Sequence, residues 1–233
     1  MLKIIASGTS LPKIPIKLVS WEEIVSWSRG LAKKILESGW IPDVIIAVAR
    51  GGYVPARLLC DFLGVENLLS IQSQHWTEAA KVAEKAIIKF PYSVDLSGLK
   101  ALLVDDIVDT GDTLLLAKQF IQENWRPKDL RIAALQWISP VAKFKPDYYY
   151  IEVKEWIWFQ YPWTRVEDIS QFIKRLFSEE NIREPVSLDV IKKKFVDAYG
   201  IEPEEFYFHE AIDLLIRKKI FAKTNDNKYV FIS

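Results

Sequence analysis

Short hydrophobic runs alternate with amphipathic helical patterns over roughly the first two thirds of the chain. Four runs are long enough for strands but too short for typical helices, at residues 44–49, 68–71, 102–104 and 132–135. Apolar residues with helical spacing predict helices before, between and after them, at about 20–38, 54–62 and 113–123. Such alternation is typical of a parallel sheet covered by helices. We therefore predict an α/β fold with a mostly parallel sheet of about five strands flanked by helices.

The pattern changes after Pro162. Apolar residues then recur at helical spacing in three successive segments, and the third runs from Pro203 to about Lys219. The last residues form two short extended stretches around a polar turn, which indicates a possible terminal hairpin. We predict two domains, residues 1–164 and a small C-terminal helical domain of three helices at 165–233.

Composition narrows the class of protein. The 233 residues carry 31 basic and 31 acidic side chains, so the net charge of zero gives no general case for binding nucleic acid or an anionic membrane. The single cysteine, Cys60, excludes a disulfide framework or a cysteine-built zinc site. No apolar run reaches the length of a membrane helix or a signal peptide. We expect a cytoplasmic protein, and the scarcity of methionine and asparagine favours a thermophilic source.

The chemistry is concentrated where the third predicted strand ends. Asp105 and Asp106 are adjacent carboxylates on that strand, and the segment Thr110–Thr113 brings two hydroxyls and a glycine to the start of a helix. The free N–H groups and the dipole of a helix N-terminus favour a phosphate. The carboxylates would repel that phosphate unless they face sugar hydroxyls or a divalent cation. The segment is therefore suited to a phosphorylated sugar with a metal ion, although acidic turns with glycine also occur as plain strand-to-helix connections.

Two segments carry a family resemblance. The string LLVDDIVDTGDT at 102–113 resembles the PRPP-binding motif of the type I phosphoribosyltransferases. Upstream, VIIAVARGGYVPA at 44–56 is similar to the pyrophosphate-binding loop of the same family, in the same chain order. Physically, two glycines let the backbone approach an anion closely, and an arginine offers a bidentate fork to diphosphate oxygens. The resemblance covers about residues 20–163.

The resemblance implies a set of site residues. Asp105 and Asp106 would engage the ribose hydroxyls with Mg²⁺ nearby, and Asp109 would act as the catalytic residue that manages the proton of the purine N7. The residues implied to bind PRPP are Asp105, Asp106, Ile107, Val108, Thr110, Gly111, Asp112 and Thr113. Those implied to bind pyrophosphate are Arg50, Gly51 and Gly52. The family also covers its site with a mobile loop, and residues 73–85 occupy that position.

The base pocket decides the substrate. Residues 155–163 resemble the hood of bacterial 6-oxopurine enzymes, which implies that Trp158 and Phe159 contact the base. Enzymes of that family have a lysine that binds the purine O6. When the two sequences are matched without gaps back from Trp158, Ser139 stands at the position of this lysine. A hydroxyl can accept from the amino group of adenine, so we predict adenine as the base. A small gap would instead place Lys143 or Lys145 there, and Thr164 stands where the family has an acidic residue near the metal.

The sequence thus predicts a purine phosphoribosyltransferase of purine salvage, converting adenine and PRPP to AMP and pyrophosphate. One alternative is a hypoxanthine, guanine or xanthine enzyme. Another is a purine-sensing transcriptional regulator, because three helices and a hairpin resemble a winged-helix module. From 165 to 233 there are 12 basic and 13 acidic residues, which disfavours nucleic acid as a partner. The resemblance also implies a homodimer.

Overall fold

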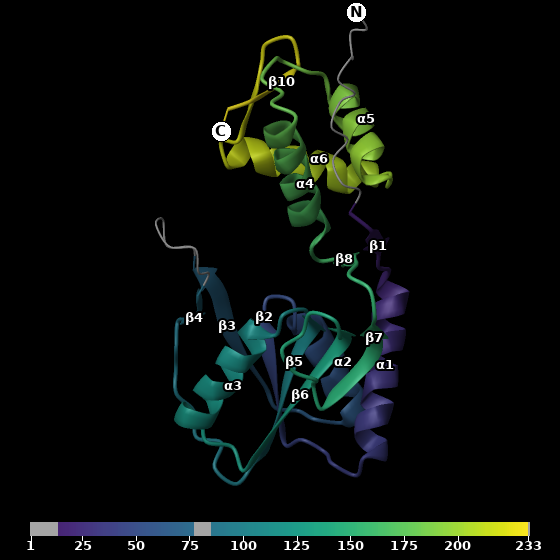
Figure 1. Cartoon of the computed structure of the whole chain (residues 1–233). Coiled ribbons are helices and arrows are strands. Elements are labelled where there is room, and N and C mark those ends of the chain that lie inside the picture. Colours follow the sequence, from purple (N-terminus) through teal and green to yellow (C-terminus); the bar gives the residue numbers. More distant parts are fainter. Residues whose placement is uncertain (1–13, 77–84, 233) are drawn as a thin grey trace, which may run out of the picture. The chain divides into compact units, whose positions relative to one another are not determined.

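The computed structural model describes residues 14–76 and 85–232, and the chain divides into two compact units (Figure 1). One unit comprises Ser20–Trp156. The other joins the described residues up to Val19 with those from Ile157 onward. No described helix has the length and hydrophobicity needed to cross a membrane.

A six-stranded sheet forms the centre of the unit Ser20–Trp156. Its strands lie in the order β4-β3-β2-β5-β6-β7. Their bounds are Val44–Ala49 for β2, Leu68–Trp76 for β3, Lys85–Lys89 for β4, Lys100–Val108 for β5, Asp129–Ile138 for β6 and Tyr148–Val153 for β7. Every neighbouring pair is parallel except β3 and β4. The predicted α/β fold with a mostly parallel sheet is confirmed.

The sheet has one more strand than we predicted, and the four runs account for its four inner strands. The other two are the edge strands β4 and β7, which mix apolar with charged or tyrosine side chains. Edge strands are only partly covered, so they lack the continuous apolar pattern that marks a buried parallel strand. Part of the predicted 73–85 loop belongs to the β3–β4 pair, and residues 77–84 lie outside the described part of the chain.

Three helices cover this sheet, α1 (Trp21–Glu37), α2 (Tyr53–Leu63) and α3 (Asp112–Asn124). Side chains of β2 alternate between its two faces, as the period of a strand requires. Val44, Ile46 and Val48 pack with Leu114 and Ile121 of α3 in one core. The helices α1 and α2 contact each other, and α2 also contacts β2 and β5. The two faces are thus filled by different helices.

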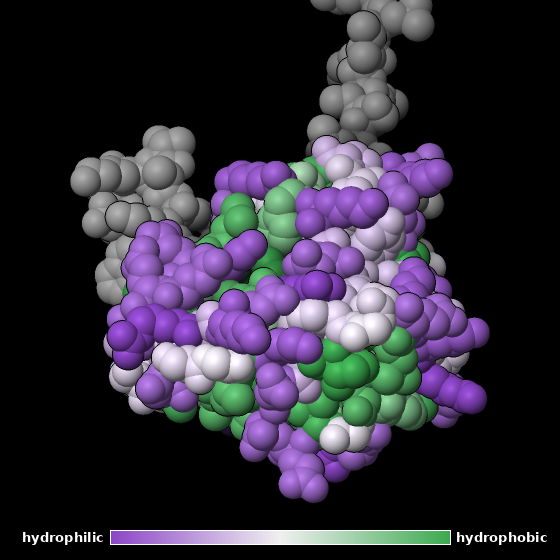
Figure 2. Space-filling model, turned by 90° about the horizontal axis from the view of Figure 1, so that it is seen from below, coloured by the Kyte–Doolittle hydropathy of each residue, from purple (hydrophilic) through white to green (hydrophobic). Residues whose placement is uncertain are grey.

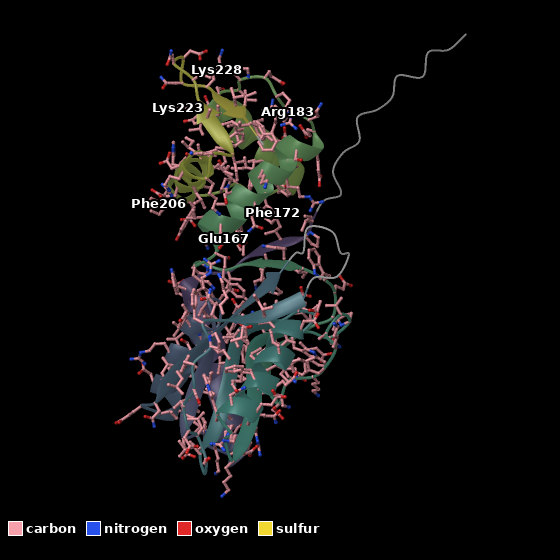
Figure 3. All side chains as sticks on the ribbon, turned by 90° about the vertical axis from the view of Figure 1, so that its left-hand side faces the viewer. Glu167, Phe172, Arg183, Phe206, Lys223 and Lys228 are labelled. Carbon is pink, nitrogen blue, oxygen red and sulfur yellow. The ribbon has the colours of Figure 1, made fainter. Side chains whose placement is uncertain are left out.

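The second unit is built around α4 (Arg165–Glu179), α5 (Leu188–Tyr199) and α6 (Glu205–Arg217). The strands β9 (Phe221–Lys223) and β10 (Tyr229–Phe231) pair antiparallel, which confirms the predicted hairpin, and Val186 adds a bridge to Tyr229. Aromatic side chains fill the core, among them Phe177, Phe195, Phe208 and Phe221. Figure 3 shows Lys223, Lys228 and Arg183 at the hairpin end of this unit.

The structural division differs from the predicted domain boundary after residue 164. A parallel pair of short strands, β1 (Ile16–Leu18) and β8 (Trp158–Gln160), belongs to the unit of α4–α6. The indole of Trp158 lies edge-on to Phe172 of α4, with ring centroids 5.4 Å apart. The division therefore falls before Ile157. Sequence periodicity locates the start of a helix but not the strand that packs with it.

Figure 2 shows the molecule from below, where hydrophilic side chains cover most of the face and separate the hydrophobic areas. A contiguous hydrophobic area lies at the lower right of this view.

Candidate active site

The two motif loops meet at the carboxyl ends of neighbouring strands. The strands β2 and β5 are parallel neighbours with Ala47 opposite Val104, so the segment after Ala49 lies beside Asp105 and Asp106. A Cβ atom on Gly51 would lie 2.4 Å from a carboxylate oxygen of Asp106. On Gly52 it would lie 2.3 Å from the carbonyl oxygen of Val104. A side chain at position 52 would clash with the backbone, so glycine is required there, and a side chain at position 51 would displace the carboxylate of Asp106. In open α/β sheets, ligands bind at this end of the strands.

Arg50 leads this loop. Its side chain is exposed, and the peptide bond between Ala49 and Arg50 is cis. The carbonyl oxygen of Arg50 accepts from the N–H of Tyr53, so α2 begins directly after the loop. The sequence gives no signal for a cis bond that does not involve proline.

Asp105 and Asp106 form a pair of adjacent carboxylates. Asp106 is buried, Asp105 is half-buried, and the N–H of Asp106 donates to Oδ1 of Asp105 at 2.9 Å. Burial and the neighbouring charge of Asp106 raise the pKa of Asp105 well above its ordinary value. Two carboxylates held together at low solvation are stabilised by a cation or by hydroxyl donors.

This pair fits a Mg²⁺ ion shared with a substrate. Proteins bind Mg²⁺ through hard oxygen ligands, and one or two carboxylates with substrate phosphates are enough. The described part of the chain holds no cluster of three or more histidine, cysteine or acidic residues suited to a metal. Asp105 and Asp106 could hold a metal that arrives with a phosphorylated substrate.

A cavity of about 220 Å³ follows the acidic pair. It is lined by Asp105, Asp106, Ile107, Asp109, Thr110, Gly111, Asp112, Thr113 and Leu114. Gly111 caps α3 with a φ of 86°, a left-handed conformation that disfavours other residues. The N-terminus of α3 thus opens on the cavity, as phosphate binding requires. Of the predicted PRPP residues, the side chain of Val108 instead packs in the core, so Val108 offers only its backbone.

Asp109 sits at the start of this loop. Partial burial raises the pKa of its carboxyl group above the ordinary value. A carboxyl group whose pKa is raised binds a proton more readily than an ordinary carboxyl group does. This suits the proton-managing role that the family resemblance implies.

A lysine that sequence reasoning placed elsewhere also contacts the loop. Nζ of Lys143 lies 2.5 Å from Oδ1 of Asp112, and its backbone N–H donates to the carbonyl oxygen of Thr110 at 2.9 Å. Lys145, two residues on, lies instead over the rings of Trp137 and Tyr149, 5.6 and 5.4 Å from their centroids. The acidic residue Asp112 within the loop was the sequence feature that could have indicated its ion pair with Lys143.

The predicted base-binding residues fall in both units. Ser139 follows β6, where its N–H donates to the carbonyl oxygen of Val153 at 3.0 Å and its hydroxyl donates to the same oxygen at 3.4 Å. Trp158 and Phe159 lie on β8 of the other unit. Successive residues of a strand face opposite sides. Trp158 packs on Phe172, and Phe159 stacks toward Tyr161 at 6.4 Å.

Comparison with known proteins identifies the first two thirds of the chain. The phosphoribosyl transferase domain family matches residues 17–167. The xanthine-guanine phosphoribosyltransferase of Desulfotalea psychrophila is 32% identical over 164 residues, 70% of this chain and 92% of that protein.

Solved structures agree. A purine phosphoribosyltransferase from Pyrococcus horikoshii Ot3 aligns with a TM-score of 0.56 and 33% identity, covering 64% of this chain and 94% of that one. A xanthine-guanine-hypoxanthine phosphoribosyltransferase from Helicobacter pylori, 22% identical, shares the fold with a TM-score of 0.55, over 66% of this chain and 97% of that one.

Proposed function

Because the chain belongs to the phosphoribosyltransferase family, we propose that it transfers the 5-phosphoribosyl group of PRPP to a purine base. The products are a nucleoside monophosphate and pyrophosphate. The observation that carries the proposal is the meeting of the two loops, since Gly51 approaches Asp106 so closely that one ligand can contact both. The purine enzymes among the relatives support the choice of base class.

In this reaction the protein mainly positions the reactants and forms no covalent bond with them. Transfer passes through a ribosyl centre with oxocarbenium character, between the leaving diphosphate and a ring nitrogen. Asp105 and Asp106 would hold the ribose hydroxyls, and Arg50 would grip the diphosphate through charge-assisted hydrogen bonds. When bound with PRPP, Mg²⁺ supplies charge neutralisation on the leaving diphosphate. The N-terminus of α3 would fix the 5-phosphate, and Asp109 would take the proton that the base releases.

The relatives support a 6-oxopurine as the base. The relatives from Desulfotalea psychrophila and Nitratidesulfovibrio vulgaris are named xanthine-guanine phosphoribosyltransferases. The 6-oxopurine alternative of the sequence analysis thus has the support of homology. The family resemblance implies that a hood aromatic, Trp158 or Phe159, stacks on the ring.

Adenine is the second candidate, and the environment of Ser139 favours it. The hydroxyl of Ser139 lies 3.4 Å from the carbonyl oxygen of Val153, which can take its hydrogen, and the hydroxyl oxygen then has lone pairs that can accept from a ligand. An acceptor suits the amino group of adenine and opposes the oxygen of a 6-oxopurine. Lys143 and Lys145, the two lysines that a gapped match would bring to the base, lie at Asp112 and over Trp137 and Tyr149.

One experiment tests both levels of the proposal. Initial rates with PRPP and Mg²⁺ are measured for adenine, hypoxanthine, guanine and xanthine, for the wild type and for Ser139→Lys. Turnover of any purine supports the phosphoribosyltransferase proposal, and absence of turnover with all four contradicts it. If adenine is the base, kcat/KM for adenine exceeds kcat/KM for hypoxanthine at least tenfold, because an unpaired acceptor costs ~1–3 kcal/mol. The substitution Ser139→Lys then lowers this adenine-to-hypoxanthine ratio. Preference of the wild type for a 6-oxopurine rejects adenine.

A further inference from the structure

The phosphate-binding loop contains an acidic residue at the point where an anion should bind. Asp112 is the first residue of α3, directly after Gly111. A carboxylate in the first turn stabilises a helix through its dipole. It also repels a phosphate dianion that uses the same helix N-terminus. The loop therefore needs a countercharge when its ligand binds.

Lys143 provides that charge from the segment after β6. Its ammonium contacts Oδ1 of Asp112 at 2.5 Å, while Oδ2 accepts from the hydroxyl of Thr110 at 3.1 Å. Asp112 thus competes for a hydroxyl that the predicted phosphate site uses. The backbone N–H of Lys143 also holds the carbonyl oxygen of Thr110. One residue secures the loop through both its backbone and its side chain.

The neighbouring residues have different contacts. The ring of Phe144 covers Gly111, since a Cβ atom there would lie 2.5 Å from Cε1 of Phe144. Lys145 makes its cation–π contacts with Trp137 and Tyr149, away from the loop residues. Lys145 is therefore a suitable control for Lys143. Both are exposed lysines, but Lys143 contacts the loop and Lys145 contacts two aromatic rings.

We propose that Lys143 is a positioning residue for the 5-phosphate of PRPP. Its ammonium neutralises Asp112 and holds that carboxylate, so that the hydroxyl of Thr110 and the helix N-terminus can serve the phosphate. The inference rests on the proposed function, because it takes the loop at 109–113 as the phosphate site. It assigns Lys143 to the sugar phosphate rather than to the base.

The test compares PRPP binding by titration calorimetry with Mg²⁺ present, for the wild type, Lys143→Met and Lys145→Met. Lys143→Met leaves Asp112 uncompensated, so its Kd for PRPP rises about fivefold to thirtyfold at low salt, as a carboxylate near a phosphate dianion implies. The increase shrinks at ~0.5 M salt because both charges are partly exposed and screened. Lys145→Met stays within about twofold of the wild type.

A second substitution separates charge compensation from folding. Adding Asp112→Asn to Lys143→Met removes the repelling charge and brings the Kd back to within about threefold of the wild type. Lys143→Arg keeps the charge and binds PRPP nearly as the wild type does. Thermal melts of every variant accompany the titrations.

The outcomes are distinguishable. A wild type that does not bind PRPP overturns the proposed function, and the inference with it. A wild type that binds PRPP, with Lys143→Met binding equally well or with no rescue by Asp112→Asn, overturns only the inference. A shift in base preference for Lys143→Met without a change in PRPP affinity assigns the lysine to the base and also overturns it.

Discussion

At the scale of single residues, the acidic pair is where folding and binding oppose each other. The raised pKa of Asp105 means that its charged form is disfavoured in the folded protein. An acid whose pKa is higher in the folded protein than in the unfolded chain lowers the stability of the fold as the pH rises from the unfolded-state pKa through the folded-state pKa. Below the unfolded-state pKa the acid is protonated in both states and has no such effect. The protein keeps the pair although it is unfavourable in the empty site, which is expected of residues retained for a ligand.

Replacing Asp105 and Asp106 together with asparagine tests this opposition. The amide keeps the shape and an acceptor for the N–H of Asp106, so the fold should persist. We expect an unchanged or higher melting temperature at pH 8, a gain that disappears near pH 4, and at least a tenfold loss of PRPP affinity. Melts across pH and calorimetry with Mg²⁺ measure both. Unchanged PRPP affinity would remove the acidic pair from the site.

Arg50 tests recognition of the diphosphate. Arg50→Lys keeps the charge but loses the planar fork, so kcat/KM should fall roughly tenfold to a hundredfold, in line with ~1.5–3 kcal/mol for hydrogen bonds to charged groups. Arg57→Lys is the control, because Arg57 lies on the next helix and pairs with Asp61 on the surface. Equal rates for Arg50→Lys and the wild type would show that Arg50 does not grip the diphosphate.

At the scale of elements, the helices and buried strands that have a continuous hydrophobic pattern could be predicted from the sequence. The helices α1–α3 appear near their predicted bounds, and each inner strand contains its predicted run, although β3, β5 and β6 extend several residues beyond it. Ser20 and Glu23 form a capping box at the start of α1. The edge strands β4 and β7 were missed because partial burial leaves no clear period. The cis bond before Arg50 and the contact of Lys143 with Asp112 depend on tertiary geometry that no local pattern carries.

Gly111 links the element scale to the site. It combines a φ of 86° with the nearby ring of Phe144, whereas Gly39 has a φ of 72° with nothing within 4 Å of an added Cβ. The loss of stability in Gly39→Ala therefore measures only the cost of placing alanine in the left-handed conformation, ~1–2 kcal/mol. We expect Gly111→Ala to lower the melting temperature further and to weaken PRPP binding, while Gly39→Ala leaves binding intact. Equal melting losses would mean that Phe144 moves aside freely.

At the scale of the whole molecule, the C-terminal unit lies mostly outside the family match, which ends at residue 167. Its three helices and hairpin, with the added bridge at Val186, have the element order that made a winged-helix module an alternative. The helix before the hairpin would be the one that enters a DNA groove. On α6 the exposed acidic and basic residues are Glu205, Asp213 and Arg217, and the two carboxylates would meet the phosphate backbone unfavourably. Two basic residues, Lys223 and Lys228, lie at the hairpin, where Figure 3 shows them.

These charges predict that the protein does not bind duplex DNA at physiological salt. Fluorescence anisotropy with a labelled random-sequence duplex, at protein concentrations up to ~10 μM and ~0.15 M salt, should show no saturable binding, because sequence-independent affinity requires several basic contacts with phosphates. Lys223→Glu with Lys228→Glu should leave both this result and PRPP turnover unchanged, since the two lysines lie in the hairpin of the other unit. Saturable binding that weakens steeply with salt and is lost in the double variant would instead make the hairpin a nucleic-acid contact. PRPP binding without turnover, found together with such DNA binding, would favour the regulator over the enzyme.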